Sequence, residues 1–157
     1  MKNAVISFSG GLDSTSLLLH LIRKEYKLYA LSFNYGQKHQ IEIDKAILNI
    51  QYLQSKGFDI NHKILDISDA FSLLNSSLTN KNQEVPSGYY REENMKTTVV
   101  PNRNAIFTSF AYAHAISINK KKPLETKIGL GVHSGDHEIY PDCRVEFYQK
   151  LFDAFKT

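Results

Sequence analysis

The sequence predicts an α/β fold in which helices cover both faces of a parallel sheet, giving three layers. Apolar strand-like runs alternate with helix-like segments along the chain, as a parallel sheet requires. The first of these strands turns through a glycine pair directly into a helix. The chain has 157 residues, 42% of them hydrophobic, so we expect a single domain spanning residues 1–157 with a sizeable core.

Four strands and four helices are expected. The strands are residues 4–8, 28–33, 60–67 and 127–132, of which the third is the weakest because polar residues interrupt it. The helices are residues 16–22, 41–53, 104–118 and 145–155; Gly57 is expected to end the second, and Asp142 to be the N-cap of the last. Residues 68–98 are polar and turn-rich, which is typical of either a lid or substrate loop or a disordered insertion.

Composition excludes several classes of protein. The net charge of +3, from 19 basic and 16 acidic residues, is too small for a nucleic-acid binder, and the cluster Lys120–Lys122 is expected to be a solvated loop. No apolar run approaches the length of a membrane span, and the N-terminus carries no signal pattern. The single cysteine, Cys143, rules out an internal disulfide. We therefore expect a cytoplasmic protein that binds neither nucleic acid nor membranes.

The segment Ser9–Ser14, with the sequence SGGLDS, has the features of a phosphate-binding loop. Glycines allow the backbone to approach an anion without an intervening Cβ, and the following helix directs its free N–H groups and the positive end of its dipole at the same point. The structural alternative is an ordinary strand–turn–helix connection with Asp13 or Ser14 as the N-cap.

The loop is neither a Walker loop, which would need G-x-x-x-x-G-K-[ST], nor the G-x-G-x-x-G loop of dinucleotide-binding proteins. It resembles the S-G-G-x-D-S loop of the ATP pyrophosphatases, the PP-loop family, whose domains are adenine nucleotide alpha-hydrolase-like and Rossmann-like. That resemblance implies an ATP site in which the loop grips the β- and γ-phosphates as a unit and pyrophosphate is released.

Three later loops are expected to join this one. The phosphate loop follows the first strand, and open α/β sheets bind their ligands at the carboxyl ends of the strands. Polar, glycine- or proline-punctuated segments follow the other strands or open helices: Asn34–His39, Pro101–Asn104 and His133–Arg144. Because such loops on a rigid sheet are where sites are built, we expect them to come together.

The motifs in these loops narrow the resemblance. Tyr35-Gly36-Gln37, Arg103-Asn104 and Tyr140-Pro141-Asp142-Cys143-Arg144, in this order after Ser9–Ser14, resemble the 7-cyano-7-deazaguanine (preQ0) synthase family, QueC. The resemblance implies that ATP and magnesium activate the carboxylate of 7-carboxy-7-deazaguanine as an acyl-adenylate. Ammonia then gives an amide, and a second ATP-dependent activation dehydrates the amide to the nitrile.

The resemblance also implies roles for particular residues. The nucleotide site would comprise Phe8, Ser9, Gly10, Gly11, Leu12, Asp13, Ser14, Thr15, Asn34, Lys38 and Arg103. The substrate site would comprise Tyr35, Gln37, Asp136, Tyr140 and Asp142. Arg103 and Arg144 are expected catalytic residues, because cations must offset the repulsion between a carboxylate and ATP. Asp13 is the third expected catalytic residue, since it would help to organise the loop or a bound magnesium ion. As structural alternatives, Arg144 could pair with Glu146 or Asp142 at the surface, and Asp142 could serve only to cap its helix.

Departures from the family pattern are visible. Asn34 stands where most members have Asp, Asn102 where Gly is usual, and Val145 where Pro is usual. The family's C-terminal region carries a four-cysteine zinc site, which cannot be built here because Cys143 is alone; no metal ligands are therefore expected. We expect either an N-terminal piece of a longer protein or a shortened relative.

Alternatives to the synthase remain open. Another PP-loop reaction is one, although tRNA thiolation would want a pair of cysteines and tRNA ligation a strongly basic face. A non-catalytic ATP-binding module is the other. The expected partners are small molecules, with a homodimer possible.

Overall fold

The computed structural model describes residues 2–37, 41–74, 100–119, 126–132 and 141–156. Their contacts divide the chain into two compact units. The first unit contains residues 1–34, 39–66 and 107–132, and the second contains residues 35–38, 67–106 and 133–157.

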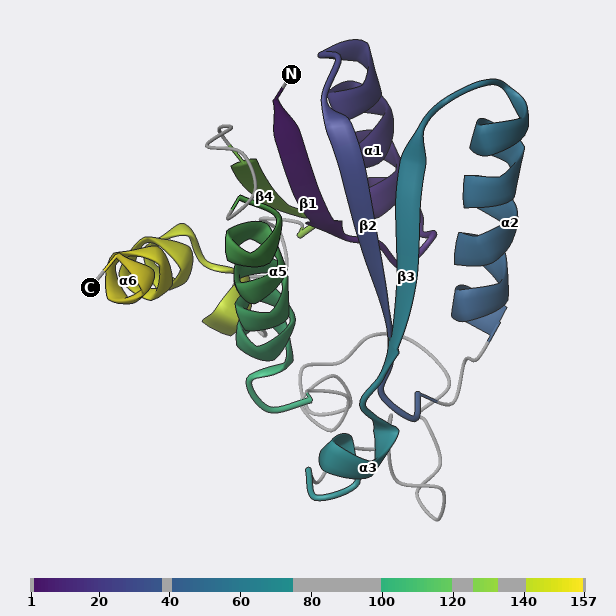
Figure 1. Ribbon diagram of the computed structural model, residues 1–157. Helices are drawn as coiled ribbons and strands as arrows, with labels where there is room; N and C mark the ends of the chain where they lie inside the picture. Colours follow the sequence, from purple (N-terminus) through teal and green to yellow (C-terminus); the bar gives the residue numbers. More distant parts are fainter. Residues whose placement is uncertain (1, 38–40, 75–99, 120–125, 133–140, 157) are drawn as a thin grey trace. The chain divides into compact units, whose positions relative to one another are not determined.

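The first unit is built on a four-stranded parallel sheet (Figure 1). Its strands are β1 (Asn3–Ser7), β2 (Lys27–Asn34), β3 (Ile60–Asp66) and β4 (Thr126–Leu130), in the order β3-β2-β1-β4. Every recorded pairing is parallel, with Ser7 beside both Leu31 of β2 and Leu130 of β4. The four strands and the parallel sheet predicted from the sequence are therefore confirmed.

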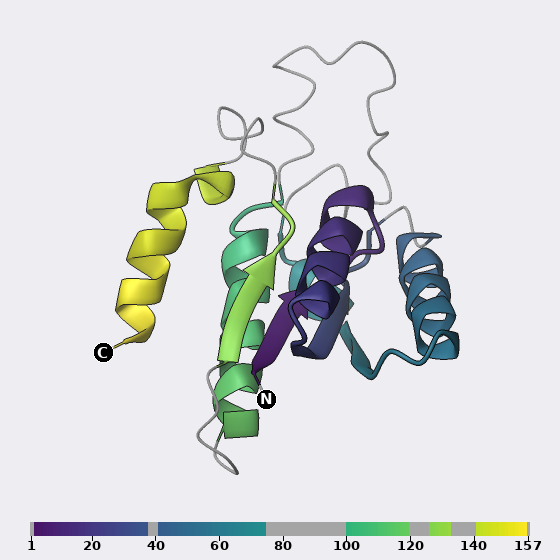
Figure 2. The same ribbon diagram turned by 90° about the horizontal axis from the view of Figure 1, so that it is seen from above.

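Helices pack on both faces of this sheet. Alternate residues of β1 and β2, such as Ile6 and Ala30, form a buried core with α1 (Leu12–Arg23) and α2 (Ile41–Ser55). The opposite face of β2 meets α5 (Arg103–Asn119), where Phe33 stacks on Phe107 with ring centroids 4.0 Å apart. Figure 2 shows β1 between α1 and α5. Side chains of a strand point alternately to opposite faces, so the two sets of contacts confirm the three layers.

Two helix boundaries in this unit follow from their glycines. Gly57 has a φ of +89° and donates its N–H to the Gln54 carbonyl at 2.9 Å, so it ends α2 as predicted. Gly11 is the N-cap of α1, and no side chain caps this helix. The alternative in which Asp13 or Ser14 serves only as an N-cap is therefore wrong.

The second unit contains α3 (Ser68–Phe71), the 3₁₀ turn η2 (Pro141–Cys143) and α6 (Val145–Phe155). The prediction of an irregular segment over 68–98 is wrong at its start, where α3 forms and Phe71 packs against Tyr35 at 5.6 Å between ring centroids. The rest of that segment from residue 75 onward lies outside the described residues. No helix in the described part of the chain is long and apolar enough to cross a membrane.

Candidate functional site

The loop between β1 and α1 is held by close backbone packing against α2. Gly10 has a φ of +76°, and a Cβ at this position would lie 2.7 Å from the backbone nitrogen of Ala46. The side chain of Asn49, one turn further along α2, donates a hydrogen bond to the Gly10 carbonyl at 3.2 Å. Only glycine satisfies both the left-handed backbone and the close approach.

Two serine hydroxyls organise the inside of the loop. The Ser9 and Ser14 oxygens lie 3.2 Å apart, and the Ser14 hydroxyl also accepts the N–H of Ser9 at 3.3 Å. The N–H of Gly11 donates to the Ser9 hydroxyl at 3.3 Å. These bonds span both ends of the loop and set its curvature.

The N-terminus of α1 supplies the donors that an anion needs. The first intrahelical bond runs from the Thr15 N–H to the Gly11 carbonyl at 3.0 Å, so the three preceding N–H groups have no acceptor within the helix. The helix dipole adds partial positive charge there. The Thr15 hydroxyl is buried without a hydrogen-bond partner. Free donors and a glycine-lined backbone fit the phosphate chain of ATP.

The carboxyl end of β4 closes the other side of this loop. A Cβ on Gly131 would lie 2.6 Å from the Ser14 nitrogen and 2.9 Å from the Asp13 carbonyl carbon. Because β1 lies between β2 and β4, the strand order reverses at this point, which is where open α/β sheets bind their ligands. The observed topology therefore places the loop at the position expected of a nucleotide site.

In the second unit, Arg103 begins α5 beside an aromatic ring. Its guanidinium carbon lies 6.0 Å from the centre of the Tyr35 ring, within the range of a cation–π interaction. The preceding residue, Asn102, has a φ of +57°, so asparagine tolerates here the left-handed backbone for which glycine is favoured. Gln37 is buried and accepts the Tyr35 N–H at 2.9 Å, which fixes the loop that carries the ring.

Asp142 and Cys143 join the start of α5. The Asp142 carboxylate accepts the backbone N–H of Asn104 at 3.1 Å, and the Asn104 amide donates to the Cys143 sulfur at 3.6 Å. The prediction that Asp142 caps the last helix is wrong, because the N-cap of α6 is Arg144 and no side chain caps it. Asp142 instead binds the first turn of a helix that lies 38 residues earlier in the chain.

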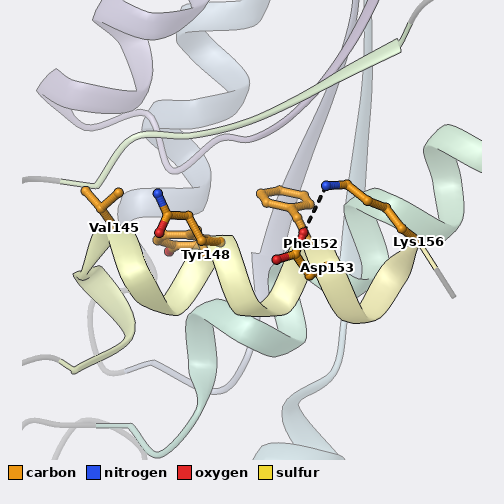
Figure 3. A pocket seen from close by; sticks show the side chains of 6 residues that line it. Val145, Tyr148, Phe152, Asp153 and Lys156 are labelled. Atoms are coloured by element: carbon orange, nitrogen blue, oxygen red, sulfur yellow. Dashed lines mark hydrogen bonds and ion pairs between the residues drawn. The ribbon is translucent and has the colours of Figure 1, made fainter.

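Tyr148 on α6 is a half-buried titratable group that interacts electrostatically with this cluster. Burial raises its pKa, the charges of Cys143 and Asp142 raise it further, and Arg103 opposes them. Its hydroxyl is buried without a hydrogen-bond partner and therefore stays protonated at neutral pH. Its ring, with Val145 and Phe152, lines an open hollow along α6, at whose far end Lys156 pairs with Asp153 at 2.9 Å (Figure 3).

The predicted site residues are divided between the two units, and some lie outside the described residues. The first unit holds Asn34 and the loop residues, of which Phe8 and Ser14 are buried; the exposed ones include Leu12 and Asp13. The second unit brings together Tyr35, Gln37, Arg103 and Asp142, whereas Arg144 is exposed at the start of α6. Lys38, Asp136 and Tyr140 lie outside the described residues. Among the described residues, no group of three or more His, Cys, Asp and Glu side chains could hold a metal ion.

Asn34 uses its side-chain amide as a hydrogen-bond donor. Its Nδ2 atom donates to the Asp66 carboxylate at 2.9 Å, across the last pair of β2 and β3. An aspartate at position 34 could not donate this bond.

The sequence-based prediction missed several residues that shape these groups. Ala46, Asn49 and Gly131 form walls of the phosphate loop, and Tyr148 adds a buried hydroxyl beside Asp142. A sequence signal existed for Gly131, because a glycine in a strand-like run often marks a close backbone approach. No local pattern pointed to Asn49 or Tyr148.

Comparison with known proteins identifies the family of this chain. The family model described as "Queuosine biosynthesis protein QueC" matches residues 3–157, nearly the whole chain. The chain belongs to the QueC family. Proteins named 7-cyano-7-deazaguanine synthase are similar to it: that of Pseudoalteromonas atlantica is 42% identical over 98% of this chain, and that of Caldicellulosiruptor saccharolyticus is 45% identical over 94%.

A third such synthase, from a Marinomonas species, is 46% identical over 96% of the chain. The chain spans 66%, 61% and 64% of the lengths of these three relatives. The QueC family assignment therefore covers nearly all of this chain, while the relatives are about half as long again.

Proposed function

We propose that this QueC-family chain binds ATP and takes part in the conversion of 7-carboxy-7-deazaguanine and ammonia to 7-cyano-7-deazaguanine, as a nitrile-forming carbon–nitrogen ligase. Family membership and the names of the relatives support the reaction. The observation that carries the ATP site is the glycine-walled loop, in which Gly10 and Gly131 admit no Cβ and the N–H groups of α1 are free of helical acceptors.

The chemistry explains why a cradle of donors is needed. A carboxylate oxygen of the substrate attacks the α-phosphorus of ATP, a bond to phosphorus forms, and the bond to the bridging oxygen breaks to release pyrophosphate. Two anions must approach each other, so donors and cations have to stabilise the charge that develops on the leaving group. We assign that role to the N-terminus of α1, the Ser9 and Ser14 hydroxyls and Thr15, with Asp13 holding magnesium on the phosphates.

We assign the deazapurine carboxylate to the cluster of the second unit. Arg103 supplies a permanent positive charge beside the Tyr35 ring, and a flat base needs an aromatic wall of that kind. Gln37, Asp136, Tyr140 and Asp142 are the proposed acceptors and contacts for the base, Asn34 and Lys38 are proposed nucleotide contacts, and Arg144 is a second proposed catalytic cation.

The test measures pyrophosphate and AMP release with ATP, magnesium, ammonia and 7-carboxy-7-deazaguanine. We expect release that depends on the carboxylate substrate, and a loss of at least about a hundredfold in Asp13→Ala and Arg103→Ala, the scale on which removing a stabiliser of transition-state charge acts. Arg23→Ala is the matched control, because Arg23 is an exposed arginine in the last turn of α1, at the end of the helix opposite the loop.

Two outcomes would count against the proposal. A protein that binds ATP but shows no release stimulated by the substrate would be an ATP-binding module rather than this synthase. Near-normal turnover in both Asp13→Ala and Arg103→Ala would refute the site assignment while leaving the reaction in place.

A further inference from the structure

A chain of hydrogen bonds runs from β3 through β2 to the start of the phosphate loop. The Ser32 hydroxyl, on β2 and fully buried, donates to the Phe8 carbonyl at 2.6 Å. The Nε2 atom of His62, on β3, lies 2.8 Å from the same hydroxyl oxygen. The His62 ring also meets the Phe8 ring edge-on, with centroids 6.3 Å apart.

The donor and the acceptor of each of these hydrogen bonds follow from the groups involved. A serine hydroxyl has a single proton, and Ser32 donates this proton in its hydrogen bond to the Phe8 carbonyl. His62 must therefore donate its Nε2–H to the Ser32 oxygen, which makes the hydroxyl a better donor in turn. Burial lowers the pKa of His62, so the ring is neutral at neutral pH and carries its proton on Nε2.

The Phe8 carbonyl lies at the point where the sheet ends and the loop begins. The pairing of β1 with β2 ends at Ser7 and Leu31, and Phe8 still donates its N–H to the Leu31 carbonyl at 2.8 Å. The N–H of the same peptide group, that of Ser9, donates to the Ser14 hydroxyl at 3.3 Å. The Phe8–Ser9 peptide plane is therefore held at both of its polar ends.

We infer that His62 and Ser32 are positioning residues of the nucleotide site, which orient the Phe8–Ser9 peptide and through it the Ser14 hydroxyl toward the β- and γ-phosphates of ATP. The inference rests on the proposed function, because it requires the loop to hold those phosphates. Ser32 does not touch the nucleotide, since it is fully buried in the sheet. Their effect is to keep a loop hydroxyl in one orientation before the ligand arrives, which reduces the cost of ordering it on binding.

The experiment compares the affinities for ATP and for AMP, which lacks the β- and γ-phosphates. We expect Ser32→Ala and His62→Leu to weaken binding of magnesium-ATP about three- to tenfold, the scale of one hydrogen bond, and to leave AMP binding unchanged. His62→Gln keeps an amide N–H at the length of Nε2 and should restore most of the ATP affinity. The double variant Ser32→Ala/His62→Leu should lose little more than Ser32→Ala, because both changes break the same chain.

His114→Leu is the matched control. His114 is another half-buried histidine of the first unit whose pKa burial lowers, but it packs on the Tyr29 ring and its Nε2 has no hydrogen-bond partner. Its replacement should leave the ratio of ATP to AMP affinity unchanged.

The outcomes separate the two proposals. An unchanged ratio in Ser32→Ala and in His62→Leu, in a protein whose wild type binds ATP, would overturn this inference alone. A wild type that binds no ATP would overturn the proposed function, and this inference with it. If His62→Leu fails to fold, the other two variants test the inference. Ser32→Ala removes only one buried oxygen, and His62→Gln keeps the N–H donor.

Discussion

The replacement of Gly131 by alanine should damage the phosphate loop without removing any side chain that we propose to bind phosphate. The added Cβ would lie 2.6 Å from the Ser14 nitrogen and 2.8 Å from its Cα, whereas ordinary contacts begin at 3.4 Å. The backbone atoms on both sides cannot rotate away, so the end of β4 and the first turn of α1 must separate by about 0.8 Å.

Forcing an extra methyl into a packed site costs about 1–3 kcal/mol of unfolding free energy. In a chain of this size that amounts to a fall in Tm of roughly 2–12 °C. Because a displacement near 1 Å can reduce turnover by about a hundredfold, the rate of ATP-dependent pyrophosphate release should fall strongly even under conditions in which the variant is still folded. Denaturant unfolding and the pyrophosphate assay measure the two effects.

Gly11→Ala is the control for this substitution on the stability scale. It adds the same methyl to the same loop, yet its nearest neighbour is the Ser9 hydroxyl at 3.4 Å and its backbone is extended, with a φ of −75°. Its unfolding free energy should stay within about 0.5 kcal/mol of the wild type. If Gly131→Ala is as stable and as active as the wild type, then the close packing of β4 on α1 is not required and the reasoning is refuted.

Three further predictions concern stability. Asn102→Val should lower the unfolding free energy by about 1–2 kcal/mol because Asn102 has a φ of +57°, whereas Asn102→Gly should not; equal losses in denaturant unfolding would contradict this. Tyr148→Phe should raise it by up to about 1 kcal/mol by removing a buried hydroxyl without a partner, and a lower midpoint would count against that account. Burial lowers the pKa of His62 and of His114, with Lys63 adding to the shift at His114, so the folded state holds fewer protons than the unfolded one. The contribution of the two neutral histidines to the unfolding free energy is complete above pH 6.5 and is lost as the pH falls through the folded pKa values. The double variant His62→Gln/His114→Gln should therefore lose less stability on acidification than the wild type, which denaturant unfolding at a series of pH values measures.

The parts of this fold that the sequence predicted are those with a strong periodic or steric pattern. The apolar run at residues 4–8 predicted a strand that lies within a residue or two of the observed β1. Short elements carry no such pattern. The four residues of α3 and the three of η2 are held by the chain around them, so no periodicity marks them.

Site residues were predictable where a motif surrounds them and unpredictable where a distant contact decides their role. Ser9–Ser14 is a complete motif, and the structure gives it the expected strand–loop–helix setting. Asp142 stands three residues before α6 begins and was assigned to that helix, yet its carboxylate binds Asn104 on α5. Rules for capping use sequence neighbours only, so they could not anticipate a partner 38 residues away.

His62 shows how a polar residue that weakens a prediction can carry information of its own. The polar interruptions in residues 60–67 made the third strand the least certain of the four, because a buried parallel strand should be apolar throughout. One of those interruptions is the residue that donates to Ser32 and, through it, reaches the Phe8 carbonyl.

The phosphate loop is thus constrained from three directions by elements that do not belong to it. The backbone of α2 meets Gly10, the end of β4 meets the first turn of α1, and the side chains of β2 and β3 hold the carboxyl end of β1. A loop fixed in this way loses little further entropy when it binds an anion, so more of the interaction energy is available to stabilise the transition state. The loop should then keep its binding conformation in the absence of ATP, and the residues that enforce that conformation are as much part of the site as the glycines that define its motif.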